Sequence, residues 1–469
     1  MGRGCKDAGL LWGAGVPREV CDRPGRCGDR PWRLVGFAVL VAIAAGCGGG
    51  KVEFTSNEHY SQVVQRETLV EMTGASQDIR QLVEHFFGTP DEPRWNLPAG
   101  ADRGTADSSA LVSLENLRRA AGAVSSDEQG VHFGLYRAQC VQCHGIVGDG
   151  RGPAAALQSP YPRDFRGGIF KYKSTLRGSR PTREDLRKTL VRGIPGSAMP
   201  SFALLPEDDL EALVDYVIYL SVRGEVERRL LRITAEQLDY SSPAAEDRWL
   251  VGARYWTTAA EGFGEIGGAE AEALVQQRRW VEEVIDQSLV RWERAAAEVV
   301  EVPEIPADIA LLATGGTLEP RGITSGKELF EGQIANCAGC HGAAGDGVTK
   351  LPADYDEWTK EWTTRLGLDP KDRSVLGSFL DAGALPPRPL GVRNLTLGAY
   401  RGGDSPAELY RRIVAGIEGT SMPAIHLVAE KSPAGLTAAE VWDVVRYVYA
   451  LGGVYALGGV GGLAAEDER

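Results

Sequence analysis

An internal repeat constrains this chain more than any other feature of its 469 residues. Residues 192–202 (RGIPGSAMPSF) match residues 415–425 (AGIEGTSMPAI), which share two glycines, an isoleucine, a methionine and a proline in register. A C-x-x-C-H segment precedes each copy, CVQCH at 140–144 and CAGCH at 337–341. Self-similarity of this kind predicts one structural module that the chain uses twice.

Hydrophobic patterning predicts helices around the repeats. Residues 207–220 and 437–451 are apolar stretches with acidic residues near their start, and each follows one copy of the repeat. Residues 58–87 also have a helical pattern. Between the modules, apolar residues recur at three- and four-residue steps, which is typical of an amphipathic helix. These residues are Val281, Ile285, Leu289, Trp292 and Ala296.

Each C-x-x-C-H segment predicts the covalent attachment of one haem. The two thiols can add across the vinyl groups of a porphyrin, and the adjacent histidine is carried beneath the iron. We therefore expect two covalently bound haem c groups. The attachment cysteines and iron-ligating histidines would be Cys140, Cys143 and His144 in the first module and Cys337, Cys340 and His341 in the second.

The methionines of the repeated loops predict the second axial ligands. The chain has only four methionines, and Met199 and Met422 are the two in matching loops. Thioether sulfur favours reduced iron, so a histidine–methionine pair raises the reduction potential and suits electron transfer. Met72 lies outside both modules, and we expect it in a core. Loop glycines would let the backbone approach the ring where a β-carbon would clash. They are Gly193, Gly196, Gly416 and Gly419.

Zinc and redox-disulfide sites are the alternatives for the cysteines. A structural zinc site needs four converging ligands, and the remaining histidines are His59, His85, His132 and His426. A redox disulfide is typical of a thioredoxin-like β-α-β pattern, which surrounds neither segment. His426 follows Met422 by four residues, so on a helical turn it could compete for the second iron.

The N-terminal sequence predicts export and lipid attachment. The apolar run 34–45 follows basic side chains, and its roughly twelve residues suit a signal peptide and are too few to span a bilayer. The run leads into AAGC, which resembles a bacterial lipobox, so we expect cleavage before Cys47 and its lipidation. An ordinary signal peptide with unmodified Cys47 is the alternative. The expected location is the bacterial cell envelope, as a membrane-anchored lipoprotein facing the periplasm.

The segments around both repeats resemble the class I cytochrome c family, in particular its tandem dihaem members. The resemblance implies an all-α fold, with two small helical cytochrome c domains and an additional helical insertion between them. In the first module it rests on CHGIVGDGRGP (143–153), PRDFRGGIFKYKSTLRGS (162–179) and RGIPGSAMP (192–200). In the second it rests on IANCAGCHGAAGDG (334–347), VRNLTLGAY (392–400) and AGIEGTSMP (415–423).

The resemblance also implies particular contacts around each ring. In this family a proline after the haem motif commonly fixes the histidine through its carbonyl, a role that Pro153 fits. A helix before each motif would pack beside the ring. Its contacts would come from Phe133, Leu135 and Tyr136 in the first domain and from Leu329 and Phe330 in the second.

We expect six segments along the chain. They are a signal peptide with an over-extended start (1–46), a lipid-anchored tether and helical N-terminal region (47–128), cytochrome c domain 1 (129–224), a helical insertion and linker (225–322), cytochrome c domain 2 (323–453) and a tail (454–469).

These features favour an electron carrier over an enzyme. Two irons with histidine and methionine ligands leave no open position for a substrate. We expect single-electron transfer from a quinol-oxidising complex or dehydrogenase to a terminal oxidase or reductase. The net charge of −13 argues against nucleic-acid binding and favours a basic protein partner. A dihaem peroxidase-type enzyme, or a haem subunit of a larger respiratory complex, is the alternative.

Overall fold

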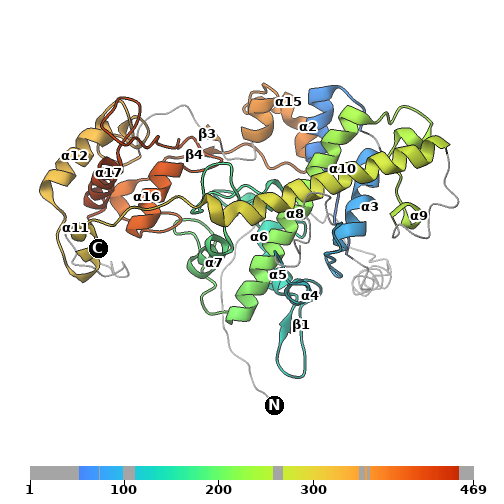
Figure 1. Ribbon diagram of the computed structural model, residues 1–469, viewed down its shortest axis with the longest axis horizontal. Helices are drawn as coiled ribbons and strands as arrows, with labels where there is room; N and C mark the ends of the chain where they lie inside the picture. The colour runs from blue at the N-terminus through green and yellow to red at the C-terminus, as the bar shows by residue number, and fades with distance from the viewer. Residues whose placement is uncertain are drawn as a thin grey trace, which may run out of the picture. The chain divides into compact units, whose positions relative to one another are not determined.

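Helices form most of the structure, which confirms the all-α prediction (Figure 1). The computed structural model describes residues 52–72, 74–98, 111–256, 268–347, 354–355 and 360–453. All of them belong to one unit, Val52–Arg469. The predicted signal peptide, Cys47 and the predicted tail lie outside the described residues. Within that part of the chain, no helix is both long and apolar enough to cross a membrane.

Strands in the described residues form two short antiparallel pairs. Strand β1 (Ser125–Ser126) pairs with β2 (His132–Phe133), with Ser125 opposite Phe133. Strand β3 (Asp354–Tyr355) pairs with β4 (Pro389–Leu390). Pairs of two-residue strands cannot carry a core, so the helices do.

Module 1, the part around the first C-x-x-C-H segment, is built on the long helix α8 (Glu207–Gln237). Helix α5 (Leu135–Gln139) precedes the haem motif, and α7 (Arg183–Arg192) leads into the methionine loop. Both pack against α8. Thr182 begins α7 with a capping box, which satisfies backbone N–H groups that the first turn leaves unpaired.

Module 2, the part around the second C-x-x-C-H segment, repeats this plan with shorter elements. Helix α12 (Pro320–Glu331) packs on α17 (Ala438–Leu451), and α16 (Pro406–Ala415) leads into the methionine loop. A β-carbon on Gly326 would lie 1.9 Å from the backbone oxygen of Asp443. Only glycine therefore allows α12 to approach α17 this closely.

In each module the helix before the haem motif packs against the helix after the methionine loop, as predicted. In module 1, Leu135 and Tyr136 are buried, and the Tyr136 ring lies 4.8 Å from that of Tyr216 on α8. In module 2, the buried Phe330 ring lies 5.2 Å from that of Tyr447 on α17. The expectation that Phe133 belongs to the first helix is wrong, because it lies in β2. Both Phe133 and Leu329 of α12 are partly exposed.

Additional helices cover α8 and distinguish module 1 from module 2. Helix α10 (Gly268–Glu293) packs along α8, as do α2 (Glu58–Thr68) and α3 (Ala75–Phe87) (Figure 1). Helix α8 continues through the predicted domain boundary at residue 224, so the insertion begins inside a helix. The prediction for α10 is confirmed at Val281, Ile285, Leu289 and Trp292, which are buried, and wrong at Ala296, which is exposed in a 3₁₀ turn.

The expectation of one helical region over residues 58–87 is wrong in detail. Helix α2 ends before Leu69, whose φ is 61°, and α3 begins after Gly74, whose φ is 83°. These left-handed conformations break the helix. Met72 between them is 3% exposed, which confirms its predicted place in the core.

The remaining elements are short. The α-helices are α4 (Leu114–Ala120), α6 (Val141–His144), α9 (Ala253–Trp256), α11 (Ala307–Ala310), α13 (Ala338–His341) and α15 (Arg373–Asp381). The 3₁₀ and π turns are η3 (Ala155–Leu157), η4 (Phe165–Gly167), η5 (Ala245–Asp247), η7 (Arg294–Glu298), η8 (Leu311–Thr314), η9 (Lys360–Thr364) and η10 (Leu395–Leu397).

Candidate haem sites

The two C-x-x-C-H segments fold into the same turn. In module 1 the backbone N–H of His144 donates to the carbonyl of Cys140 at 2.8 Å, and that of Cys143 does so at 3.1 Å. In module 2 the corresponding bonds from His341 and Cys340 to Cys337 have the same lengths, 2.8 and 3.1 Å. Each motif therefore presents two thiols and one imidazole from a single helical turn.

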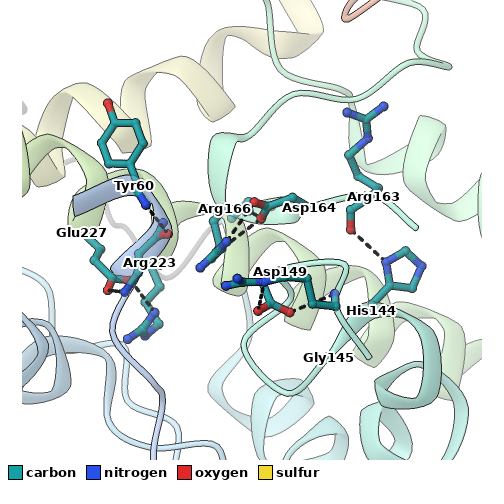
Figure 2. A network of polar contacts seen from close by, with 12 residues as sticks. Tyr60, His144, Gly145, Asp149, Arg163, Asp164, Arg166, Arg223 and Glu227 are labelled. Carbon is teal, nitrogen blue, oxygen red and sulfur yellow. Dashed lines mark hydrogen bonds and ion pairs between the residues drawn. The ribbon is translucent and has the colours of Figure 1, made fainter. Parts of the chain in front are cut away.

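A backbone carbonyl orients each imidazole. The Nδ1 atom of His144 lies 3.0 Å from the carbonyl oxygen of Arg163 (Figure 2), and that of His341 lies 3.0 Å from the carbonyl oxygen of Arg393. Because a carbonyl only accepts hydrogen bonds, Nδ1 carries the proton and Nε2 keeps its lone pair. The expectation that Pro153 supplies this carbonyl is wrong.

Burial keeps both imidazoles neutral. It lowers the pKa of His144 to about 4, against the opposing effect of the hydrogen bond to Arg163. Burial also lowers the pKa of His341, again against a backbone hydrogen bond to Arg393. Neutral imidazole is the form that ligates a metal, so both histidines are ready to bind at neutral pH.

The thiols do not have the character of a redox dithiol. Burial raises the pKa of Cys140 to about 12 and that of Cys337 to about 11. Reactive dithiols instead have lowered pKa values that stabilise the thiolate. No disulfide joins the four cysteines of the described residues.

The two methionine loops have the same internal bonds. We name residues 194–199 methionine loop 1 and residues 417–422 methionine loop 2. In loop 1 the Ile194 N–H donates to the carbonyl of Met199 at 3.1 Å, and in loop 2 the equivalent bond to Met422 is 3.2 Å. A hydroxyl closes each turn, from Ser197 at 2.7 Å in loop 1 and from Thr420 at 2.8 Å in loop 2. Met199 and Met422 are half-buried.

A glycine before each methionine loop lets the chain fold back on itself. Gly193 ends α7 with a φ of 67°, and Gly416 ends α16 with a φ of 68°. A β-carbon on either would lie 2.6 Å from the carbonyl carbon of the proline after the methionine, Pro200 or Pro423. The contact with the proline backbone therefore requires glycine at both positions, in addition to the predicted contact of the loop backbone with a porphyrin.

These residues fit a c-type haem. Each module offers two thiols for thioether bonds, an imidazole with a free Nε2, and a thioether in a loop of fixed shape. Met199 and Cys140 both belong to the apolar packing of module 1, while Cys337 packs against the core of module 2.

Two of the other histidines, His426 and His132, are exposed. His426 is exposed and lies in extended chain, so the helical turn that would bring it beside Met422 does not form. His132 is exposed in β2, and its Nδ1 lies 2.9 Å from the hydroxyl of Ser126.

A network of charged side chains begins beside the carbonyl of Arg163 in module 1 (Figure 2). Asp164 accepts two hydrogen bonds of 3.0 Å from the guanidinium of Arg166, which is 1% exposed. On α8, Arg223 pairs with Glu227 at 3.0 Å, and both are buried. Glu227 also accepts the backbone N–H of Asn57 at 2.8 Å, which ties the N-terminal region to α8.

Sequence reasoning missed the carbonyls of Arg163 and Arg393 and the network beyond them. A usable signal was present. The segments 163–168 and 393–398 lie in matching places after the two motifs. The Phe165 N–H donates to the carbonyl of Gly148, and the Leu395 N–H donates to that of Gly345. Aligning the two modules with each other would therefore have marked both arginines.

Comparison with known proteins gives two family matches. The family model for cytochrome c oxidase, cbb3-type, subunit III matches residues 132–217, and the cytochrome c family model matches residues 323–452. None of the curated proteins is similar enough to count as a match. Among solved structures, a chain of the reducing HAO-like protein complex of Kuenenia stuttgartiensis is 21% identical, with a TM-score of 0.40. The alignment covers 70% of this chain and 97% of that chain. Each family match encloses one C-x-x-C-H segment and one methionine loop.

Proposed function

We propose, from the premise that this chain is a tandem dihaem c-type cytochrome, that it carries single electrons between redox proteins. The observation that carries the proposal is the duplication of one donor set on one local geometry. When bound, haem c supplies a one-electron couple. The proposed attachment residues are Cys140, Cys143, Cys337 and Cys340, and the proposed axial ligands are His144, Met199, His341 and Met422.

The chain's own residues would keep both iron sites closed to substrate. The carbonyls of Arg163 and Arg393 hold the two imidazoles with Nε2 free. The internal bonds of the methionine loops hold the backbone of Met199 and Met422. Two closed sites suit electron transfer, whereas a peroxidase needs a displaceable ligand at one haem.

Spectroscopy of the purified dihaem protein tests this proposal. We expect the reduced protein to be low-spin and to leave carbon monoxide and peroxide unbound. Met199→His should lower one of two reduction potentials, because nitrogen stabilises ferric iron better than thioether sulfur does. It should also halve the charge-transfer band of methionine-ligated ferric haem. Binding of carbon monoxide to the unaltered protein would favour the enzyme instead.

The proposed partners are a quinol-oxidising complex or dehydrogenase as donor and a terminal oxidase or reductase as acceptor. The acidic net charge supports docking on basic protein surfaces. Residues 1–46 carry seven basic and four acidic side chains, so their removal would make the chain three charges more acidic. If docking depends on these charges, the rate at which a basic acceptor protein oxidises the reduced cytochrome, measured by stopped flow, should fall steeply as ionic strength rises.

We further propose a lipid anchor at Cys47 that holds the protein at the periplasmic side of the cell envelope. The support is the sequence alone, the apolar run 34–45 followed by AAGC. Cys47→Ser should release the cytochrome into the soluble fraction or leave its precursor uncleaved. A processed Cys47→Ser protein that stayed in the membrane fraction would contradict the anchor.

A further inference from the structure

Each module contacts the methionine loop of the other through an arginine. The guanidinium of Arg177, in module 1, donates to the carbonyl of Met422 at 3.1 Å. It also donates to the carbonyls of Thr420 at 3.3 Å and Ile417 at 3.4 Å. In return, Arg401 of module 2 donates to the carbonyl of Gly196 at 2.9 Å. Loop 2 thus receives three bonds from Arg177, and loop 1 receives one from Arg401.

A buried lysine fixes the segment that presents Arg177. The Lys173 side chain is 3% exposed, and its ammonium pairs with Glu418 of loop 2 at 2.5 Å. The same ammonium donates to the carbonyls of Leu176, at 3.0 Å, and Ser179. The backbone N–H of Gly178 donates to Glu418 at 3.2 Å. Bonds from Lys173, before Arg177, and from Gly178, after it, therefore fix the backbone on both sides of Arg177.

The segment has no counterpart in module 2. From Gly168 after η4 to the N-cap Thr182 of α7 the chain advances 14 residues. From Gly398 after η10 to the N-cap Ser405 of α16 it advances only seven. The seven additional residues of module 1 bring Arg177 to loop 2. The three bonds from one arginine to the other module's methionine loop are thus a feature that module 2, with its single bond from Arg401, does not repeat.

We propose that Arg177 is a positioning residue for the axial ligand Met422, acting from the other module. The inference rests on the proposed function, in which Met422 ligates the second haem. Met422 bears both the thioether and the carbonyl that Arg177 binds, so the guanidinium restrains the ligand's own backbone. Charge-assisted hydrogen bonds of this kind are stronger than neutral ones. Without them loop 2 keeps its internal bonds and the contacts of Glu418 and loses the bonds from module 1 to the backbone of Met422.

Competition by an added ligand measures this restraint. In a Met199→His background, the remaining methionine–ferric-iron band reports on module 2 alone. Imidazole displaces methionine and abolishes that band. Adding Arg177→Ala should lower the dissociation constant of imidazole about tenfold, the equivalent of ~1.4 kcal/mol from bonds to a charged group at an exposed site. Arg177→Lys keeps the positive charge and can donate to one of the carbonyls. Its dissociation constant for imidazole should therefore lie between those of Arg177→Ala and the parent.

An exposed arginine elsewhere supplies the matched control. Arg118 lies near the end of α4, outside both methionine loops, and Arg118→Ala should change the imidazole affinity less than about twofold. An Arg177→Ala protein within twofold of its parent would overturn the inference and leave the proposed function standing. A Met199→His protein with an undiminished band would overturn the ligand assignment, and the inference with it.

Discussion

The two modules share their haem-binding geometry and differ in what surrounds it. Both have the same motif turn, the same carbonyl on the histidine and the same methionine loop. In module 1 the ion pair of Asp164 and Arg166 lies beside that carbonyl and beneath α8. In module 2, Asn394 and Thr396 occupy these two places, and Thr396 is exposed.

The difference shows that one proposed ligand set lies in two environments. Haem potentials depend on burial and on charges near the iron as well as on the axial ligands. Helix α8 has 31 residues, whereas α17, the matching helix of module 2, has 14. The greater length of α8 gives α2, α3 and α10 a surface to pack on, and these helices cover module 1. We therefore expect the two haems to have separate potentials despite matching ligands.

Removing the attachment cysteines should have the largest effect and should separate the modules. Cys140→Ala/Cys143→Ala should leave one haem by mass, and so should Cys337→Ala/Cys340→Ala. Module 1 also packs α2, α3 and α10 into its core, so its apo form should keep more helix than apo module 2. Far-UV circular dichroism and limited proteolysis measure this. Equal helix loss in both variants would show that the extra helices do not stabilise the haem fold.

Breaking the ion pair of Asp164 and Arg166 in module 1 should cost less than losing a haem. Arg166→Met removes a guanidinium that is 1% exposed and leaves the half-buried Asp164 without its ion-pair partner, which should destabilise by about 1–3 kcal/mol. The matched change in module 2, Thr396→Met, alters an exposed side chain and should stay within about 0.5 kcal/mol. Urea unfolding followed by haem absorbance gives both values. Similar losses for the two variants would remove the contrast between the modules.

Sequence reasoning predicted what is repeated and missed what is specific to one copy. The motif turns, the methionine loops and the helices after them recur in sequence, so their pattern was readable. The carbonyl of Arg163 was missed because every residue type has a backbone carbonyl, so the contact with His144 does not require a particular side chain at that position. Arg177 was missed because its partners lie about 240 residues away, and such long-range contacts depend on packing.

Two glycines offer a smaller test of how each module packs its long helix. A β-carbon on Gly224 of α8 would lie 2.4 Å from Cα of Arg166, and one on Gly326 of α12 would lie 1.9 Å from the oxygen of Asp443. Gly224→Ala and Gly326→Ala should each destabilise their module by about 1–3 kcal/mol through overpacking. Gly377→Ala in α15, where a β-carbon meets nothing within 4 Å, is the control and should be neutral or stabilising. Thermal unfolding of the three variants measures the difference.

The smallest effect should come from the ion pair of Asp308 and Arg446 in module 2, whose side chains are 18% and 12% exposed. Asp308 accepts two hydrogen bonds of 2.8 Å from Arg446 on α17, and these bonds lower its pKa to about 2. The folded state therefore binds fewer protons than the unfolded state, whose carboxyl titrates near its usual value of about 4. The pair's contribution is present above about pH 4 and is lost as the pH falls toward about 2. Because solvent screens the pair, Asp308→Asn should cost at most about 1 kcal/mol at pH 6. The difference in unfolding free energy between the two proteins should shrink as the pH is lowered through that window. A difference that grew toward acid pH would mean that Asp308 is protonated in the folded protein and that the pair does not stabilise α17.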